Sequence, residues 1–68
     1  MQEILIGKTY RHYKGNLYKI INFAVHSETL EDMIVYQSLY DDKIWARPKT
    51  MWNEIVDNNG TLRFTLIS

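Results

Sequence analysis

Two histidines and a carboxylate are the residues of this sequence that first suggest metal chemistry. His12, His26 and Glu28 together would make a His-His-Glu set. A zinc site needs about four ligands, usually His or Cys with a carboxylate. The chain has no Cys, and its two histidines lack the short spacing that organises a structural site. The sequence therefore predicts no bound metal and no cofactor.

Nucleophilic catalysis is the second chemistry to consider, because residues 26–28 hold the three residue types of a catalytic triad. Consecutive side chains diverge, so His26, Ser27 and Glu28 cannot line up as base, nucleophile and orienting acid. The GxSxG pattern that exposes a nucleophilic serine is missing around Ser27. A pairing of Ser27 with His12 across the fold remains open. We predict that the protein is not an enzyme.

Basic and aromatic residues offer a third chemistry. Residues 11–14 (RHYK) form a dense block, and Trp45 and Arg47 are two positions apart, so they share one face of a strand. Arg pairs bidentately with phosphate, and Trp or Tyr offers a stacking plane for a base. This pattern predicts a non-catalytic module that binds a nucleotide-like anion or a single nucleic-acid strand. The predicted ligand-binding residues are Arg11, His12, Tyr13, Lys14, His26, Ser27, Glu28, Tyr40, Trp45 and Arg47.

Two other functions stay open on the same residues. The first is a protein-interaction module of SH3-like type, which would grip a partner peptide with Tyr and Trp beside the acidic residues 41–42. The second is a small hydrolase or lyase acting on a nucleotide. A purely structural interpretation is also open, in which Arg47 bridges Glu28 or Asp42 within the molecule and Trp45 packs in the core.

Length and charge limit these choices. The 68 residues suffice for one small domain, residues 1–68, and the formal net charge of +0 argues against a purely electrostatic binder of nucleic acid or membranes. Residues 1–26 carry four Lys or Arg against one Glu, whereas residues 27–58 carry three against seven acidic residues. No apolar run approaches the roughly 18 residues of a membrane span, and no basic leader is seen. We therefore expect a cytoplasmic protein without a membrane partner.

Short strands must position the candidate residues. The segment LYKIINFAV, residues 17–25, has apolar residues on both alternating faces, which predicts a strand with little solvent exposure. Asp41-Asp42-Lys43 and Asn58-Asn59-Gly60 are turn sequences that separate later strands. The predicted strands are residues 17–25, 33–40, 44–47 and 61–67, after an aromatic and basic opening segment at residues 7–13.

The helical content is expected to be small. Pro48 suits the first position of a short helical turn that would reach Ile55 and direct Met51, Trp52 and Ile55 toward the core. The spacing of Thr29 and Asp32 resembles a weak capping box, which allows one more turn there. We predict an all-β fold, a small five-stranded SH3-like barrel with one short helical turn; an OB-like barrel is the alternative. The predicted core comprises Tyr18, Ile20, Phe23, Val35, Leu39, Phe64 and Leu66.

A series of motifs runs through nearly the whole chain in one order: GKxYRHYKGNxY (residues 7–18), HSET (26–29), VYQxLY (35–40), WxRP (45–48) and RF (63–64). This series resembles the DUF1653 family of small bacterial and phage domains. The resemblance supports a small β domain and implies no particular activity or ligand. Two departures are visible: residues 41–43 stand where the family usually has a Gly-containing turn, and Trp52 stands where Phe is common.

Overall fold

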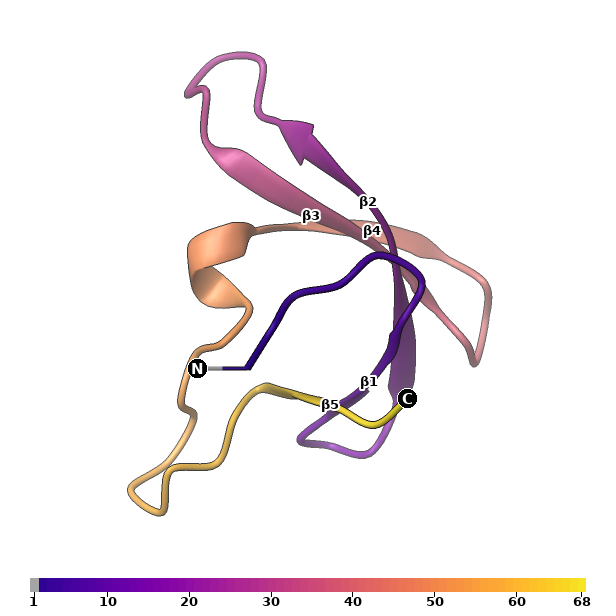
Figure 1. Ribbon diagram of the computed structural model, residues 1–68, viewed down its shortest axis with the longest axis vertical. Helices are drawn as coiled ribbons and strands as arrows, with labels where there is room; N and C mark the ends of the chain where they lie inside the picture. The colour runs from indigo at the N-terminus through magenta and orange to yellow at the C-terminus, as the bar shows by residue number, and fades with distance from the viewer. Residues whose placement is uncertain (1) are drawn as a thin grey trace.

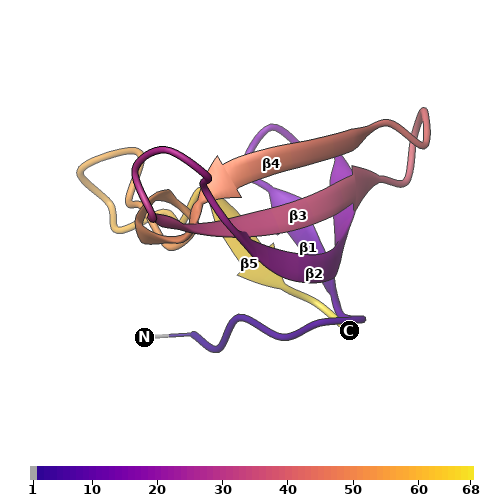
Figure 2. The ribbon, with the colours of Figure 1, turned by 90° about the horizontal axis from the view of Figure 1, so that it is seen from above.

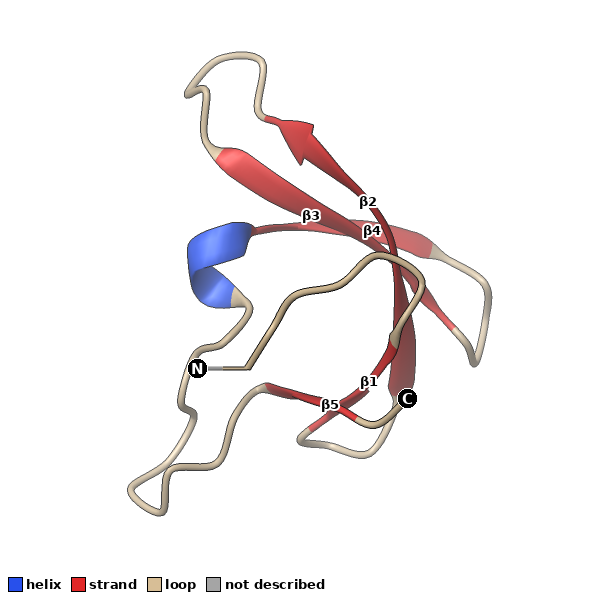
Figure 3. Ribbon diagram, in the orientation of Figure 1, coloured by secondary structure: helices blue, strands red, loops and turns tan. Residues whose placement is uncertain are grey.

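The computed structural model describes residues 2–68 as one curved antiparallel sheet (Figures 1 and 3). Its strand order is β4-β3-β2-β1-β5, and the predicted all-β class with five strands is confirmed. Within residues 2–68 no helix is long and apolar enough to cross a membrane. The elements are β1 (Thr9–His12), β2 (Leu17–Val25), β3 (Asp32–Ser38), β4 (Ile44–Pro48), the 3₁₀ helix η1 (Lys49–Met51) and β5 (Phe64–Leu66).

The sheet is open, so the predicted small SH3-like barrel is not confirmed. Strands β4 and β5 are the two edges, and no pairing joins them within residues 2–68. Strand β5 is only three residues long, which leaves little backbone for a further ladder. The gap is filled by side chains instead, since Trp52 from the segment after η1 packs beneath the sheet with no exposed surface. Figure 2 shows that segment lying beside β4 and β5.

The free edge of β5 is occupied by the side chain of Gln2. Its amide nitrogen donates to the carbonyl oxygen of Phe64 at 2.6 Å, and its amide oxygen accepts the backbone N–H of Leu66 at 2.9 Å. Asn53 holds Gln2 in place, because its Oδ1 accepts from the Gln2 amide nitrogen at 2.9 Å and its Nδ2 donates to the backbone carbonyl oxygen of Gln2 at 3.0 Å. An unpaired strand edge is a template for aggregation, and here one glutamine satisfies it.

Strand β2 bends at a bulge. Ile20 pairs with Tyr36 whereas Asn22 pairs with Val35, so Ile21 is an extra residue in the ladder. The bulge reverses the alternation, so that the apolar residues before and after it face the same side of the sheet. The prediction that β2 is buried on both faces is therefore wrong, and residues 21–25 are all exposed. The inward-facing residues of β2 are Tyr18, Ile20, Phe23 and Val25.

The core is small and mostly aromatic. Trp52 stacks on Phe64 with ring centroids 3.9 Å apart and planes inclined by only 3°. Tyr10 and Tyr36 meet Trp52 edge-on at 5.3 and 5.0 Å, an arrangement that suits the ring quadrupoles. The buried hydrophobic residues are Tyr10, Ile20, Ile34, Tyr36, Trp52 and Phe64.

The predicted core is only partly right. Ile20 and Phe64 are buried and Trp52 points inward, as predicted. Phe23 faces inward but lies outside the buried aromatic cluster, and Leu39 lies in the turn after β3, so both are exposed. The helical turn predicted to reach Ile55 is limited to η1, and Met51 and Ile55 are exposed. The predicted core residues that are half-buried are Tyr18, Val35 and Leu66, and the segment at residues 27–29 is a turn rather than a helix.

Candidate functional site

A cleft of about 170 Å³ opens on the inner face of the sheet, the face that carries Ile20 and Tyr36. Strand register explains its composition, because directly paired residues project to the same face. Tyr36 pairs with Trp45, and Ile34 pairs with Arg47. Toward the other edge of the sheet, His12 of β1 pairs with Phe64 of β5 and projects to the same inner face. The cleft is lined by His12, Tyr18, Tyr36, Trp45, Arg47 and Phe64.

The aromatic walls of the cleft hold one another in fixed orientations. Tyr18 meets Tyr36 edge-on at 5.4 Å and Phe64 edge-on at 5.7 Å, and Tyr36 meets Phe64 at 5.7 Å. Trp45 is 50% exposed, so the structural interpretation in which it packs in the core is wrong. A half-exposed indole beside a rigid aromatic wall is a surface on which a planar ligand can stack.

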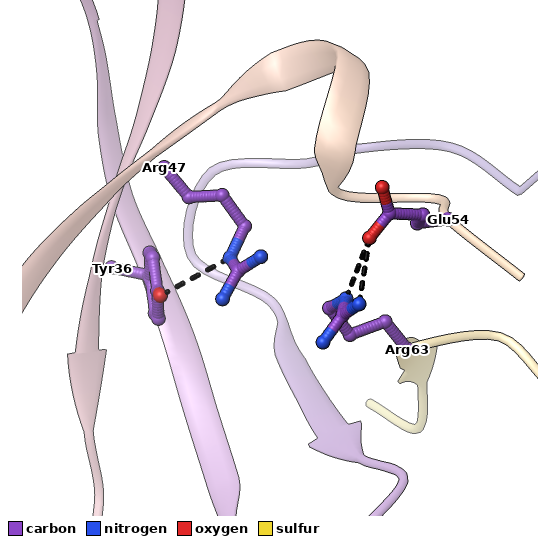
Figure 4. A network of polar contacts seen from close by, with 4 residues as sticks. All are labelled: Tyr36, Arg47, Glu54 and Arg63. Atoms are coloured by element: carbon purple, nitrogen blue, oxygen red, sulfur yellow. Dashed lines mark hydrogen bonds and ion pairs between the residues drawn. The ribbon is translucent and has the colours of Figure 1, made fainter. Parts of the chain in front are cut away.

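Arg47 is the charged group of the cleft (Figure 4). Its Nε donates a long hydrogen bond of 3.5 Å to the hydroxyl of Tyr36, and its guanidinium carbon lies 5.6 Å from the centre of the Phe64 ring. The ion pair found within residues 2–68 joins Arg63 to Glu54 at 2.7 Å, so the internal bridge from Arg47 to Glu28 or Asp42 is not formed. The two terminal nitrogens of Arg47 therefore remain available to an anion.

His12 lines the cleft, and one of its two ring nitrogens already has a partner. Its Nδ1 accepts the backbone N–H of Lys14 at 3.2 Å, so the neutral ring carries its proton on Nε2. Burial lowers the pKa of His12 below its ordinary value. Nearby positive charges lower this pKa further, and they belong to Arg63, Arg47 and Lys14. The ring is thus held as a neutral Nε2–H donor in a positive environment.

Several predicted ligand-binding residues lie elsewhere. Arg11 is exposed on the outer face, because it alternates with the inward-facing Tyr10 and His12 along β1. Tyr40 is 86% exposed in the turn between β3 and β4. Tyr13 and Lys14 follow His12 in the β1–β2 turn and flank the cleft without lining it.

The segment 26–28 also lies away from the cleft. It belongs to the loop between β2 and β3, which projects beyond the rest of the sheet (Figure 1). Tyr18 lines the cleft at the opposite end of β2, roughly 20 Å along the strand. The pairing of Ser27 with His12 that the sequence left open is thus not formed. Here His26 supports the loop, because its Nδ1 accepts the backbone N–H groups of Glu28 and Thr29 at 3.1 and 3.3 Å.

Three residues of the cleft were missed as site residues by sequence reasoning: Tyr18, Tyr36 and Phe64. Tyr18 and Phe64 were assigned to the core only, and Tyr36 to one face of a strand whose two faces are both apolar. The register of β3 with β4 is the signal that joins Tyr36 to Trp45. Across residues 2–68 no three His, Cys, Asp or Glu side chains gather as metal ligands would.

A second hollow, of about 490 Å³, lies between the N-terminal segment and η1. Glu31 and Asp32 stand on its rim with Lys49, whose ammonium lies 5.8 Å from the centre of the Phe23 ring. Its charge is mixed, in contrast to that of the Arg47 cleft. The lining residues are Ile4, Glu31, Asp32, Lys49, Thr50 and Asn53.

Comparison with known proteins agrees with this fold. The family described as "Protein of unknown function (DUF1653)" matches residues 8–66. A crystal structure of a DUF1653 protein from Bordetella bronchiseptica superimposes with a TM-score of 0.81 at 36% sequence identity, covering 98% of this chain and 91% of that one. No curated protein matches the chain.

Proposed function

Because the chain belongs to the DUF1653 family, whose description assigns no activity, we propose a function from the cleft itself: a non-catalytic module that binds an anionic, nucleotide-like ligand. Arg47 carries this proposal. It is half-buried on the inner face, its nearest polar partner is a neutral tyrosine hydroxyl, and no carboxylate is bonded to it within residues 2–68. A partly desolvated cation without a counter-ion is costly, and a ligand anion relieves that cost.

The aromatic walls suit the remaining part of such a ligand. A planar ring can stack on Trp45 while its phosphate meets the terminal nitrogens of Arg47 and the Nε2–H of His12. The volume of about 170 Å³ is below the roughly 300–1,000 Å³ typical of pockets that enclose whole small molecules. The cleft therefore fits one ring with its phosphate better than a fully enclosed dinucleotide.

Binding is favoured over hydrolysis by the residues that the cleft lacks. Its six lining residues include no carboxylate and no serine, so a nucleophile with an adjacent base is missing from them. Ser27, the candidate nucleophile, lies in the β2–β3 loop at the far end of β2.

A protein-interaction role is the second candidate, and one observation favours it. Leu30, in the β2–β3 loop, is 75% exposed and adopts a φ of 61°, a left-handed conformation that is costly for a leucine. The loop is nevertheless held by hydrogen bonds between His26 and residues 28–31. An apolar side chain held in solvent by an ordered, strained loop suits an anchor for a protein partner.

Thermal shift with mononucleotides and cyclic nucleotides tests the proposed ligand class. A ligand at about 100 times its dissociation constant adds roughly 2.7 kcal/mol of stability and raises the melting midpoint. Arg47→Lys keeps the charge but loses the planar fork, so it should weaken nucleotide binding about tenfold or more. Arg11→Lys is the matched control on the outer face and should leave affinity unchanged. The absence of any nucleotide-induced shift, or wild-type affinity in Arg47→Lys, would contradict the proposal.

A further inference from the structure

A second aromatic and cationic unit lies directly beside the cleft. The ring of Tyr13 has the ammonium of Lys14 at 5.8 Å from its centre and the guanidinium carbon of Arg63 also at 5.8 Å. Tyr13 is 44% exposed, and its backbone N–H donates to the carbonyl oxygen of Arg63 at 2.9 Å. The unit is thus fixed to the segment that precedes β5, and it offers a second aromatic surface next to positive charge.

His12 joins this unit to the cleft. Its ring centre lies 4.6 Å from that of Tyr13 and 5.0 Å from that of Phe64, so no gap separates the two aromatic surfaces. Because Nδ1 accepts the backbone N–H of Lys14, the Nε2–H is the neutral ring donor that His12 has left to offer a ligand at this junction. A phosphate that bridged two stacked bases would find a hydrogen bond at this junction.

The charges around the junction are positive although the chain is neutral as a whole. Arg63, Arg47 and Lys14 are the charged groups that act on His12. Glu54 is the acidic neighbour of Arg63 and accepts from both its Nε and one terminal nitrogen, while Arg47 has no such partner within residues 2–68 (Figure 4). Acidic residues 28, 31 and 32 lie in or beside the β2–β3 loop, at the other end of the sheet.

We propose that this continuous surface binds two successive nucleotides of a single-stranded nucleic acid, the first base in the cleft against Trp45 and the second on Tyr13. The phosphate between them contacts Arg47 and the Nε2–H of His12, and the next phosphate contacts Lys14. This inference rests on the proposed nucleotide-binding function of the cleft. A single strand is required because bases inside a duplex are stacked on one another and cannot stack on protein side chains.

Binding of a six-residue deoxythymidine oligomer, compared with thymidine monophosphate, tests the proposal. The oligomer should bind at least tenfold more tightly. Its log K should fall with log salt at a slope of about −1.4, because each of the two contacted phosphates contributes roughly −0.7 for a single strand. The monophosphate should show a much shallower slope.

Variants of the second unit distinguish base binding on Tyr13 from base binding in the cleft. Tyr13→Ala should weaken oligomer binding roughly 5- to 100-fold while leaving monophosphate affinity within about twofold. Lys14→Gln should reduce the oligomer salt slope by about 0.7. Lys19→Gln removes the same charge from the outer face of β2 and is the control that should change neither.

The outcomes distinguish the inference from the function on which it rests. If the monophosphate binds at Arg47 as tightly as the oligomer, and Tyr13→Ala changes nothing, the two-nucleotide inference is overturned while the proposed function stands. If the oligomer annealed to its complement binds as tightly as the single strand, the stacking inference is also overturned. If neither probe binds, both proposals fail together.

Discussion

The two histidines of this protein make the same local hydrogen bond and serve different regions. Nδ1 of His12 accepts the backbone N–H of Lys14, and Nδ1 of His26 accepts that of Glu28, in both cases from the residue two positions later. His12 is the last residue of β1 and its side chain faces the inner side of the sheet, so its ring packs on Phe64 and lines the cleft. His26 follows β2 in a projecting loop, where its ring orders a turn that carries the exposed Leu30.

This difference shows that residue type and local spacing do not assign a role. The β1–β2 turn is continuous with the aromatic core, whereas the β2–β3 loop extends beyond it (Figure 1). Substitutions near His12 should therefore alter both stability and nucleotide binding, and substitutions near His26 should alter local stability without altering nucleotide binding. Four experiments test this contrast.

The largest effect is expected at the floor of the cleft. Phe64→Ala removes a buried ring that stacks on Trp52, and such a substitution costs about 3–5 kcal/mol in the free energy of unfolding. Denaturant unfolding measures this loss. Leu30→Ala in the β2–β3 loop is the matched truncation and should cost well under about 1 kcal/mol. Equal losses in the two variants would remove the contrast between the regions.

A smaller effect is expected at His26. His26→Ala leaves two backbone N–H groups of the loop without their acceptor and should cost about 1 kcal/mol, as loss of a helix cap does. His26→Asn offers an amide oxygen in a similar place and should recover most of that stability. Both variants should bind a nucleotide like the unaltered protein. Weakened binding in His26→Asn would place the loop in the ligand site after all.

Leu30→Gly should stabilise the protein. Glycine adopts a φ of 61° without the steric cost that leucine incurs. Its greater freedom in the unfolded chain offsets part of this gain, so the free energy of unfolding should rise by about 0.5–1 kcal/mol. Asp42, with a φ of 60° in the β3–β4 turn, is the comparison, because aspartate tolerates this conformation better. Asp42→Gly should therefore gain less than Leu30→Gly in thermal unfolding. The opposite order would show that Leu30 is not strained.

The smallest effect is the pH dependence due to His12. Because burial and nearby cations lower its pKa in the folded state, the unfolded chain binds a proton more readily. The contribution of neutral His12 to the free energy of unfolding is therefore fully present above the ordinary histidine pKa of about 6.5. It is lost as the pH falls below that value. The aspartates whose pKa is lowered, Asp41 and Asp57, lose their contribution only below about pH 4, in a separate range.

Melting midpoints measured between pH 5 and 7 isolate this effect. His12→Gln keeps a donor near the position of Nε2 but does not titrate, so its stability should vary less with pH over that range. His26→Asn is the control and should leave the His12 dependence in place. An unchanged pH dependence in His12→Gln would contradict the environment described for His12.

The sequence predicted the strands of this fold better than their faces. The five strands and the turns between them follow from alternation and from turn residues such as Gly60. The bulge at Ile21 has no local sequence signal, and it reverses which side chains of β2 point inward. Strand β3 is apolar on both faces, so only its pairing with β2 and β4 decides that Ile34 and Tyr36 form the core.

The sequence predicted the site residues that share one face of a single strand. It missed those that are brought to the cleft by pairing between different strands. Trp45 and Arg47 lie together because they are two residues apart on β4. Arg11 was misplaced because it is adjacent to His12 in sequence, and adjacency in a strand means opposite faces. Tyr18 and Phe64 reach the cleft through pairing between distant segments, which composition and spacing cannot show.

The two tryptophans of the chain occupy opposite environments, and this gives the protein two intrinsic optical reporters. Trp52 has no exposed surface and stacks on Phe64, so its fluorescence emission should be blue-shifted and should move to longer wavelength only on unfolding. Trp45 is half exposed at the cleft, so a base stacked on it should quench its emission while the fold stays intact. Trp45→Phe would leave a single-tryptophan protein that reports folding alone.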